Sequence, residues 1–170
     1  MLNYGKKMKE PVMRIGISLL IALLLIGCAH PVPESRSAIV TFKAKGIRLH
    51  DTAFVTKTGR EVEVDVYSAG EMVLRITTGS MFCINGQCLS DDEFTAKYLS
   101  PYYPPRLIGD ILQKVPLDIE AEVEPMVNGG FTQQEYRRDQ YDIRYVVQPD
   151  SVLFKDLLNG IIIAVKDLKE

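Results

Sequence analysis

The sequence predicts an α+β domain: a curved antiparallel sheet with two helices inserted in the middle of the chain. Three observations predict it: runs of alternating apolar and polar residues, tight Gly-containing turns between them, and a helical apolar period over about 90–115. Consecutive strands joined by short turns pair antiparallel and twist. Two helices then cover one face of the sheet, an arrangement that encloses an apolar cavity suited to a ligand.

The chain begins with the layout of a secretory signal. Basic residues, Lys6, Lys7, Lys9 and Arg14, precede an apolar run over 15–26. About 12 residues make roughly 18 Å of helix, which is short for a hydrocarbon core of roughly 30 Å. The start codon stays open among Met1, Met8 and Met13.

The end of this run, Leu25-Ile26-Gly27-Cys28, resembles the bacterial lipobox. Residues 1–27 are therefore predicted to be a lipoprotein signal peptide, with Cys28 acylated as the mature N-terminus; an uncleaved anchor helix is the alternative. Acyl chains bury methylenes at roughly 0.8 kcal/mol each, so two or three of them hold a protein on a membrane. Ala29 in place of Asp favours the outer membrane, by resemblance to known lipoproteins.

The rest of the chain divides into a tether and one domain. Residues 28–38 are polar and rich in Pro and Ser, as expected of a lipidated tether, and 39–170 form the domain. Removing 1–27 takes away four of 20 basic and one of 22 acidic residues, which leaves 16 against 21, a net charge of about −5. This charge argues against nucleic acid as a partner, and against strong electrostatic binding to anionic lipid.

Two cysteines flank a predicted hairpin turn. Asn85-Gly86 is a strong type I′ signal, so Cys83 and Cys88 form the non-hydrogen-bonded pair, where side chains approach most closely. An exported chain reaches an oxidising compartment, and a structural disulfide is predicted. A redox-active pair is the alternative, although the spacing is not C-x-x-C.

Alternation marks the other strands. Val62, Val64 and Val66 share one face of residues 60–67, and acidic residues share the other, as in a sheet with one wet face. The remaining strands are predicted over 39–49 (with a bulge or bend at Gly46), 52–58, 71–77, 131–137, 142–148, 152–157 and 161–168. The acidic stretch 117–127 is either an extra strand or a loop.

The helical stretch has clear boundaries. Ser90 and Glu93 make a capping box, and Pro101 ends the first helix. A second helix is predicted over about 105–115, with Leu107 and Ile111 on its apolar side. The sequence presents no catalytic set and no metal-ligand spacing around its two His, so we predict no enzyme, no metal and no cofactor.

The order of elements resembles the LolA/LolB fold of lipoprotein carriers, an unclosed β-barrel with a helical lid. The match is carried by Phe42-Lys43-Ala44-Lys45-Gly46, the crossing Ser100–Pro104 between the helices, and the ending Tyr141–Tyr145 with Gly160–Val165. Because this chain is itself predicted to be a lipoprotein, it is most similar to the LolB type. LolB-type proteins carry a protruding loop with an exposed Leu, whereas the connection after Ile76 here has none. The chain is thus interpreted as a truncated relative, with Tyr102 and Tyr103 either facing the membrane instead or packing the lid.

The resemblance implies a function and a set of cavity residues. It implies an outer-membrane receptor, lipid-anchored on the periplasmic face, that accepts acylated lipoproteins from a LolA-like periplasmic carrier and binds their acyl chains. The candidate cavity residues, for each of which ordinary core packing is the alternative, are Phe42, Val62, Val64, Val66, Leu74, Ile76, Leu107, Ile111, Ile143, Tyr145, Phe154, Ile161 and Ile163. Alternative functions are an assembly partner of an outer-membrane machine such as lipopolysaccharide export, and glycolipid binding.

Overall fold

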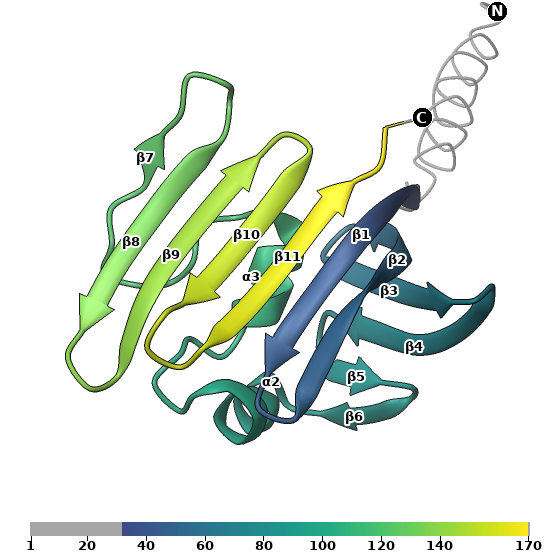
Figure 1. Cartoon of the computed structure of the whole chain (residues 1–170), viewed down its shortest axis with the longest axis horizontal. Coiled ribbons are helices and arrows are strands. Elements are labelled where there is room, and N and C mark those ends of the chain that lie inside the picture. The colour runs from purple at the N-terminus through teal and green to yellow at the C-terminus, as the bar shows by residue number, and fades with distance from the viewer. Residues whose placement is uncertain (1–31, 170) are drawn as a thin grey trace, which may run out of the picture. The chain divides into compact units, whose positions relative to one another are not determined.

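A computed structural model describes residues 32–169 of the chain. They form one antiparallel sheet of eleven strands in the order β6-β5-β4-β3-β2-β1-β11-β10-β9-β8-β7. The end strands β6 and β7 do not pair with each other, so the sheet is unclosed (Figure 1). Within residues 32–169 helices cover only Asp91–Leu99 and Leu107–Gln113, so this part of the chain is mostly β rather than the predicted α+β. The predicted signal peptide and Cys28 lie outside the described residues.

The first hairpin differs from its prediction. Strand β1 (Glu34–Ala44) turns at Lys45-Gly46 into β2 (Ile47–Thr58), with Gly46 at φ 78°. The single strand predicted over 39–49 is therefore wrong, since Gly46 is in the turn and not a bulge. Residues 34–38, assigned to the tether, belong to β1, because Ala38 is fully buried and pairs with Asp167.

The valine-rich strand was predicted correctly. In β3 (Glu61–Ser68) the three valines are buried, and β4 (Glu71–Thr78) pairs with it. On the other side of β3, Asp65 accepts two hydrogen bonds from the Arg75 guanidinium, at 2.6 and 2.7 Å. This alternation fixes which face of the sheet is covered.

A small hairpin and two short helices follow. The hairpin consists of β5 (Phe82–Ile84) and β6 (Gln87–Leu89), and Asn85 and Gly86 both have positive φ, as the type I′ prediction requires. The first helical segment consists of α2 (Asp91–Phe94) and a π-helical turn, η1 (Thr95–Leu99). The second is α3 (Leu107–Gln113), which ends at Lys114 in the left-handed region.

The chain ends in a second antiparallel set. The acidic stretch 117–127 is mostly loop, held by the Gln133 side chain, which binds the Leu117 N–H at 2.8 Å. The remaining strands are β7 (Glu124–Pro125), β8 (Phe131–Arg137), β9 (Tyr141–Gln148), β10 (Ser151–Asp156) and β11 (Ile161–Asp167). Strand β11 pairs with β1 and joins the two halves of the sheet.

The helices lie on one side of the sheet. In Figure 1 the strands β10 and β11 pass in front of α3. The covered side, the inner face, carries the buried core, and α3 contributes Leu107, Ile108, Ile111 and Leu112 to it. The opposite side, the outer face, is turned toward the viewer in Figure 1 and carries no helix among the described residues.

Candidate functional site

The predicted cavity residues do lie together on the inner face and its helices. Twelve of the thirteen are buried in one hydrophobic core, and Leu74 is half-buried against it. The sequence pattern therefore identified the inward side chains. Whether they surround a cavity depends on what fills the space between sheet and helices.

Under α3 that space is filled. Leu107 and Ile111 are fully buried, and the Tyr145 hydroxyl donates a hydrogen bond to the Val115 carbonyl at 3.0 Å. Phe154 is also fully buried and meets the Tyr103 ring edge-on, with centroids 5.8 Å apart. Side chains at this end pack against one another as in an ordinary protein core.

Of the two tyrosines in the crossing between the helices, one packs into the core and the other is exposed. Tyr103 is 6% exposed and packs on Tyr141 and Phe154, whereas Tyr102 is 55% exposed. Only Tyr102 is therefore available to an outside surface.

A buried carboxylate stabilises the α3 end of the inner face through hydrogen bonds. Asp156 is 1% exposed and accepts hydrogen bonds from the Tyr103 hydroxyl, the amides of Asp142, Leu158 and Asn159, and the Asn159 side chain. Burial acts to raise the pKa of Asp156, but these donors outweigh it and lower the pKa below its usual value. Burial and the bond to Asp156 raise the pKa of Tyr103. Both oxygens are satisfied, which fits a structural role.

At the other end of the inner face the packing leaves a hollow. An apolar pocket of about 190 Å³ lies between the first strands and α2. All seven of its lining side chains are apolar: Phe42, Ile47, Leu74, Ile76, Phe82, Ile84 and Phe94. Three of them, Phe42, Leu74 and Ile76, are among the predicted cavity residues.

The other four pocket residues were missed. Ile47 was placed inside a continuous strand rather than after a turn. Phe82 and Ile84 flank Cys83 and alternate with it, which could have identified them. Phe94 was assigned only to the apolar stripe of its helix.

Phe94 closes the pocket from the helix side. It is 1% exposed, its ring centroid is 3.7 Å from that of Phe82, and the Tyr98 ring follows at 5.0 Å. The segment that carries it, α2 with η1, spans only nine residues, Asp91–Leu99. We call this segment the lid.

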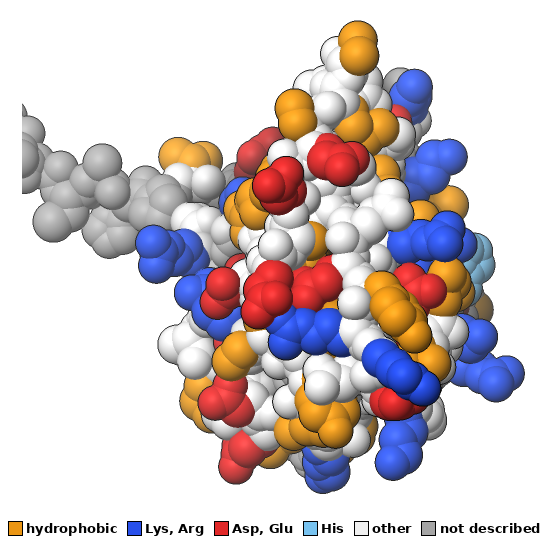
Figure 2. Space-filling model, turned by 90° about the vertical axis from the view of Figure 1, so that its left-hand side faces the viewer, with side chains coloured by type: hydrophobic (Ala, Val, Ile, Leu, Met, Phe, Trp, Pro, Cys, Tyr) orange, Lys and Arg blue, Asp and Glu red, His pale blue; other side chains and the backbone are white. Residues whose placement is uncertain are grey.

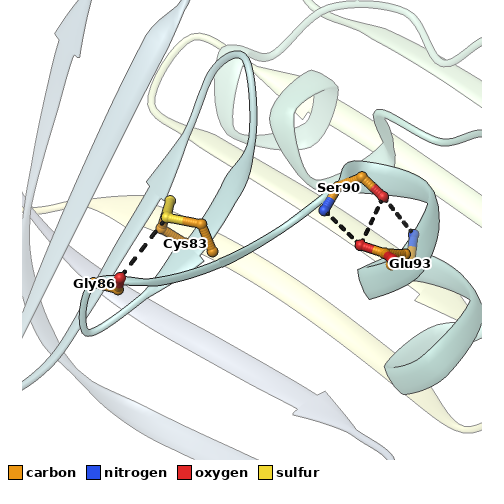
Figure 3. Close-up of a disulfide and its surroundings, with 5 residues drawn as sticks. Cys83, Gly86, Ser90 and Glu93 are labelled. Atoms are coloured by element: carbon orange, nitrogen blue, oxygen red, sulfur yellow. Dashed lines mark hydrogen bonds between the residues drawn. A yellow bond between two sulfur atoms is a disulfide. The ribbon is translucent and has the colours of Figure 1, made fainter.

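The lid begins at a complete capping box. The Ser90 hydroxyl accepts a hydrogen bond from the Glu93 amide at 3.3 Å, and the Glu93 carboxylate accepts one from the Ser90 amide at 3.1 Å (Figure 3). The Ser90 backbone and hydroxyl bonds lower the pKa of the Glu93 carboxyl. The predicted start of this helix is confirmed.

A disulfide fastens the hairpin that lines the pocket. Cys83 and Cys88 are directly opposite in β5 and β6 and are joined by an S–S bond of 2.05 Å (Figure 3). The predicted pairing is present, and it lies between two pocket residues, Phe82 and Ile84. The disulfide therefore holds one wall of the pocket.

A larger hollow of about 810 Å³ lies at the rim where the β1–β2 and β10–β11 turns meet Leu99. Its lining includes three cations, Lys43, Lys45 and Arg48, and one predicted cavity residue, Ile161. This hollow is open and partly charged, so it does not suit a hydrocarbon chain.

Within 32–169, no three His, Cys, Asp or Glu side chains are grouped so that they could hold a metal ion. No helix in that part of the chain is long and apolar enough to cross a bilayer. Comparison of the sequence with known protein families gives no match, and neither does comparison with curated proteins.

Proposed function

We propose that this chain is a LolB-like receptor, anchored to the outer membrane through an acylated Cys28, that accepts acylated lipoproteins from a LolA-like periplasmic carrier. The observation that carries this proposal is the apolar pocket between the sheet and the lid. Acyl chains gain roughly 0.8 kcal/mol per buried methylene, so a transfer protein must offer them an apolar surface while they cross water. Such a protein needs no nucleophile or metal.

The size of the pocket sets a condition on this function. About 190 Å³ is below the roughly 300–1,000 Å³ of typical ligand sites, although a cavity of roughly 150 Å³ in another protein binds benzene. In the closed form the pocket therefore admits only the end of an acyl chain. Accommodating more requires the lid to move outward and take Phe94 away from Phe82.

The β3–β4 hairpin supplies an exposed apolar element. Met72 and Val73, just after its turn, are 48% and 50% exposed. The hairpin projects from the body of the sheet in Figure 1. These two residues are our candidates for the part played by the exposed Leu of LolB-type proteins.

The cellular test is depletion of the protein. Lipoproteins should then accumulate on the soluble carrier instead of reaching the outer membrane. Normal lipoprotein sorting after depletion would rule out the receptor role.

The molecular test fills the pocket. Leu74→Trp should abolish binding of a fluorescent fatty acid, because the indole occupies the hollow. Ile119→Trp is the matched control, since Ile119 is also half-buried against the core but lies in the loop after α3, away from the pocket. Equal binding by both variants would contradict the assignment, and mass spectrometry of lipids extracted with the protein would reveal a bound glycolipid instead.

The filled core under α3 favours a second candidate function. If the lid does not open, the chain resembles a structural lipoprotein that assembles with an outer-membrane machine, such as one that exports lipopolysaccharide. Purification from native membranes distinguishes the two functions. A stoichiometric membrane partner supports assembly, whereas transient capture of acylated proteins supports the receptor.

A further inference from the structure

The outer face of β8–β11, β1 and β2 is basic, although the chain as a whole is acidic and the outer face of the next strand, β3, carries Glu61, Glu63 and Asp65. Strand alternation places five Lys or Arg on this face of β8–β11, β1 and β2, and in these six strands it places one carboxylate there, Asp142. The five are Lys43, Arg48, Arg144, Lys155 and Lys166. Figure 2 shows this face edge-on at its right-hand margin, where Lys and Arg side chains project.

Four of these cations form a single row across the sheet. Arg48 pairs with Lys43, Lys43 with Ile162, Ile162 with Lys155, and Lys155 with Arg144. With strands about 4.8 Å apart, the row spans about 19 Å over five strands. We call these four cations the basic row.

The basic row is not explained by the fold. Within residues 32–169 none of its members forms an ion pair, although other Arg and Lys side chains do. Arg48 lies directly opposite Lys43, and Lys155 opposite Arg144, and like charges in opposite positions destabilise a sheet. An external anionic surface would relieve this repulsion.

The neighbouring row supplies apolar contact. Thr41, Ala164, Leu153 and Val146 are in register one step along the same face, and all are half-buried with no helix over them. A broad face that combines a basic row with shallow apolar side chains suits the interface of a bilayer with anionic head groups.

The predicted anchor is long enough to permit this orientation. Cys28 is six residues before Glu34, where β1 begins, so an extended tether reaches at most about 21 Å. β1 itself, with eleven residues, is about 36 Å long. Standing on its N-terminal end, β1 would hold the basic row far from the bilayer, whereas lying flat it brings the row to the head groups.

From these observations we infer that the outer face of β8–β11, β1 and β2 docks on an anionic lipid surface, leaving the lid and the apolar pocket turned toward the aqueous side. This inference rests on the lipid anchor of the proposed function. It does not depend on the identity of the cargo.

The test is amine footprinting of the mature, lipidated protein on vesicles of phosphatidylcholine, alone or mixed with phosphatidylglycerol. Each cation near such a surface multiplies the ratio of docked to undocked protein by about five. Modification of Lys43, Lys155 and Lys166 should therefore fall at least about five-fold on the anionic vesicles. Lys97 on η1 is the internal control and should be modified equally on both. About 1 M salt should abolish the protection, since the Debye length is then about 3 Å.

Paired charge reversals locate the contact. Lys155→Glu with Arg144→Glu should remove the protection of Lys43 on anionic vesicles. Lys97→Glu with Arg106→Glu changes the net charge equally at the helices and should leave that protection intact. If both pairs act alike, overall charge and not this face governs binding, and the inference fails.

Other outcomes also decide the matter. Equal modification of Lys43 on both kinds of vesicle overturns lipid docking. Protection in native membranes but not on anionic vesicles shows that a protein covers this face, which also overturns it. Protein that washes off both kinds of vesicle disproves the anchor and with it this inference, whereas intact protection without cargo transfer supports docking and disproves only the receptor role.

Discussion

The two ends of the inner face are built from the same kinds of side chain, yet one is filled and the other is hollow. Under α3, helix residues such as Leu107 and Ile111 reach the sheet and leave little room. Under the lid, four residues of α2 place one large side chain, Phe94, over a pocket of about 190 Å³. The comparison teaches that the number of apolar side chains buried by the covering helix, more than the apolar character of the sheet, decides where a ligand can enter. Four are buried in α3, whereas Phe94 alone is buried in α2.

The largest expected difference between the two ends is in stability. Phe154→Ala, in the filled end, should lower the free energy of unfolding by about 3–5 kcal/mol, because it leaves a cavity in close packing. Ile84→Ala, beside the existing hollow, should cost less than about 2 kcal/mol, since fewer neighbours are lost. Urea unfolding of the two variants measures this, and equal losses would mean that the hollow is closed in solution.

The next largest expected effect is the loss of stability when the Asp156 carboxylate, at the filled end, is removed. Asp156→Asn should cost about 2 kcal/mol at neutral pH, since charged hydrogen bonds to buried donors are lost. Because the pKa of Asp156 is lowered on folding, its stabilisation is complete above the ordinary value of about 3.9 and disappears as the pH falls through the lower folded pKa. Urea unfolding from pH 6 to about 2 should show the two proteins converging in acid, and a constant gap would contradict this account.

Removing the disulfide should affect both stability and fatty-acid binding at the hollow end. Replacing Cys83 and Cys88 by Ala should cost about 2 kcal/mol, the value for a loop of this length. Binding of a fluorescent fatty acid should weaken as well, since Phe82 and Ile84 lose their fixed positions. Titration with the fatty acid after reduction by dithiothreitol should reproduce the double variant, and unchanged affinity would show that the hairpin wall does not contribute.

The smallest effect concerns the lid itself. Ser90→Ala removes the N-cap and should cost about 1 kcal/mol. Amide hydrogen exchange should then rise in Asp91–Leu99 and stay unchanged in α3, and fatty-acid uptake should be faster. Faster exchange in α3 as well would mean that the two helices open together.

Local patterns predicted much of this structure. The valines of β3, the positive φ of Asn85 and Gly86, and the capping box at Ser90 each follow from the chemistry of a few neighbouring residues. The β1–β2 turn was misplaced because Lys45-Gly46 interrupts a run that is apolar on both sides, and a glycine there also fits a bulge.

The cavity was predictable only in part. Alternation shows that Val64 and Tyr145 point inward, and both do. It does not show that Ile111 fills the space above them, because that depends on how two segments distant in the sequence meet. The pocket lies where this filling stops, beside Ile47 and Phe94, and no local pattern marks that position.

The pairing of β1 with β11 has a consequence for when the protein can fold. Arg36 and Asp167, whose side chains meet at 2.7 Å, are separated by 131 positions along the chain. Contacts this remote carry a large loop-closure entropy and form late. The pairing at the centre of the sheet therefore cannot form until the last strand, β11, has been synthesised.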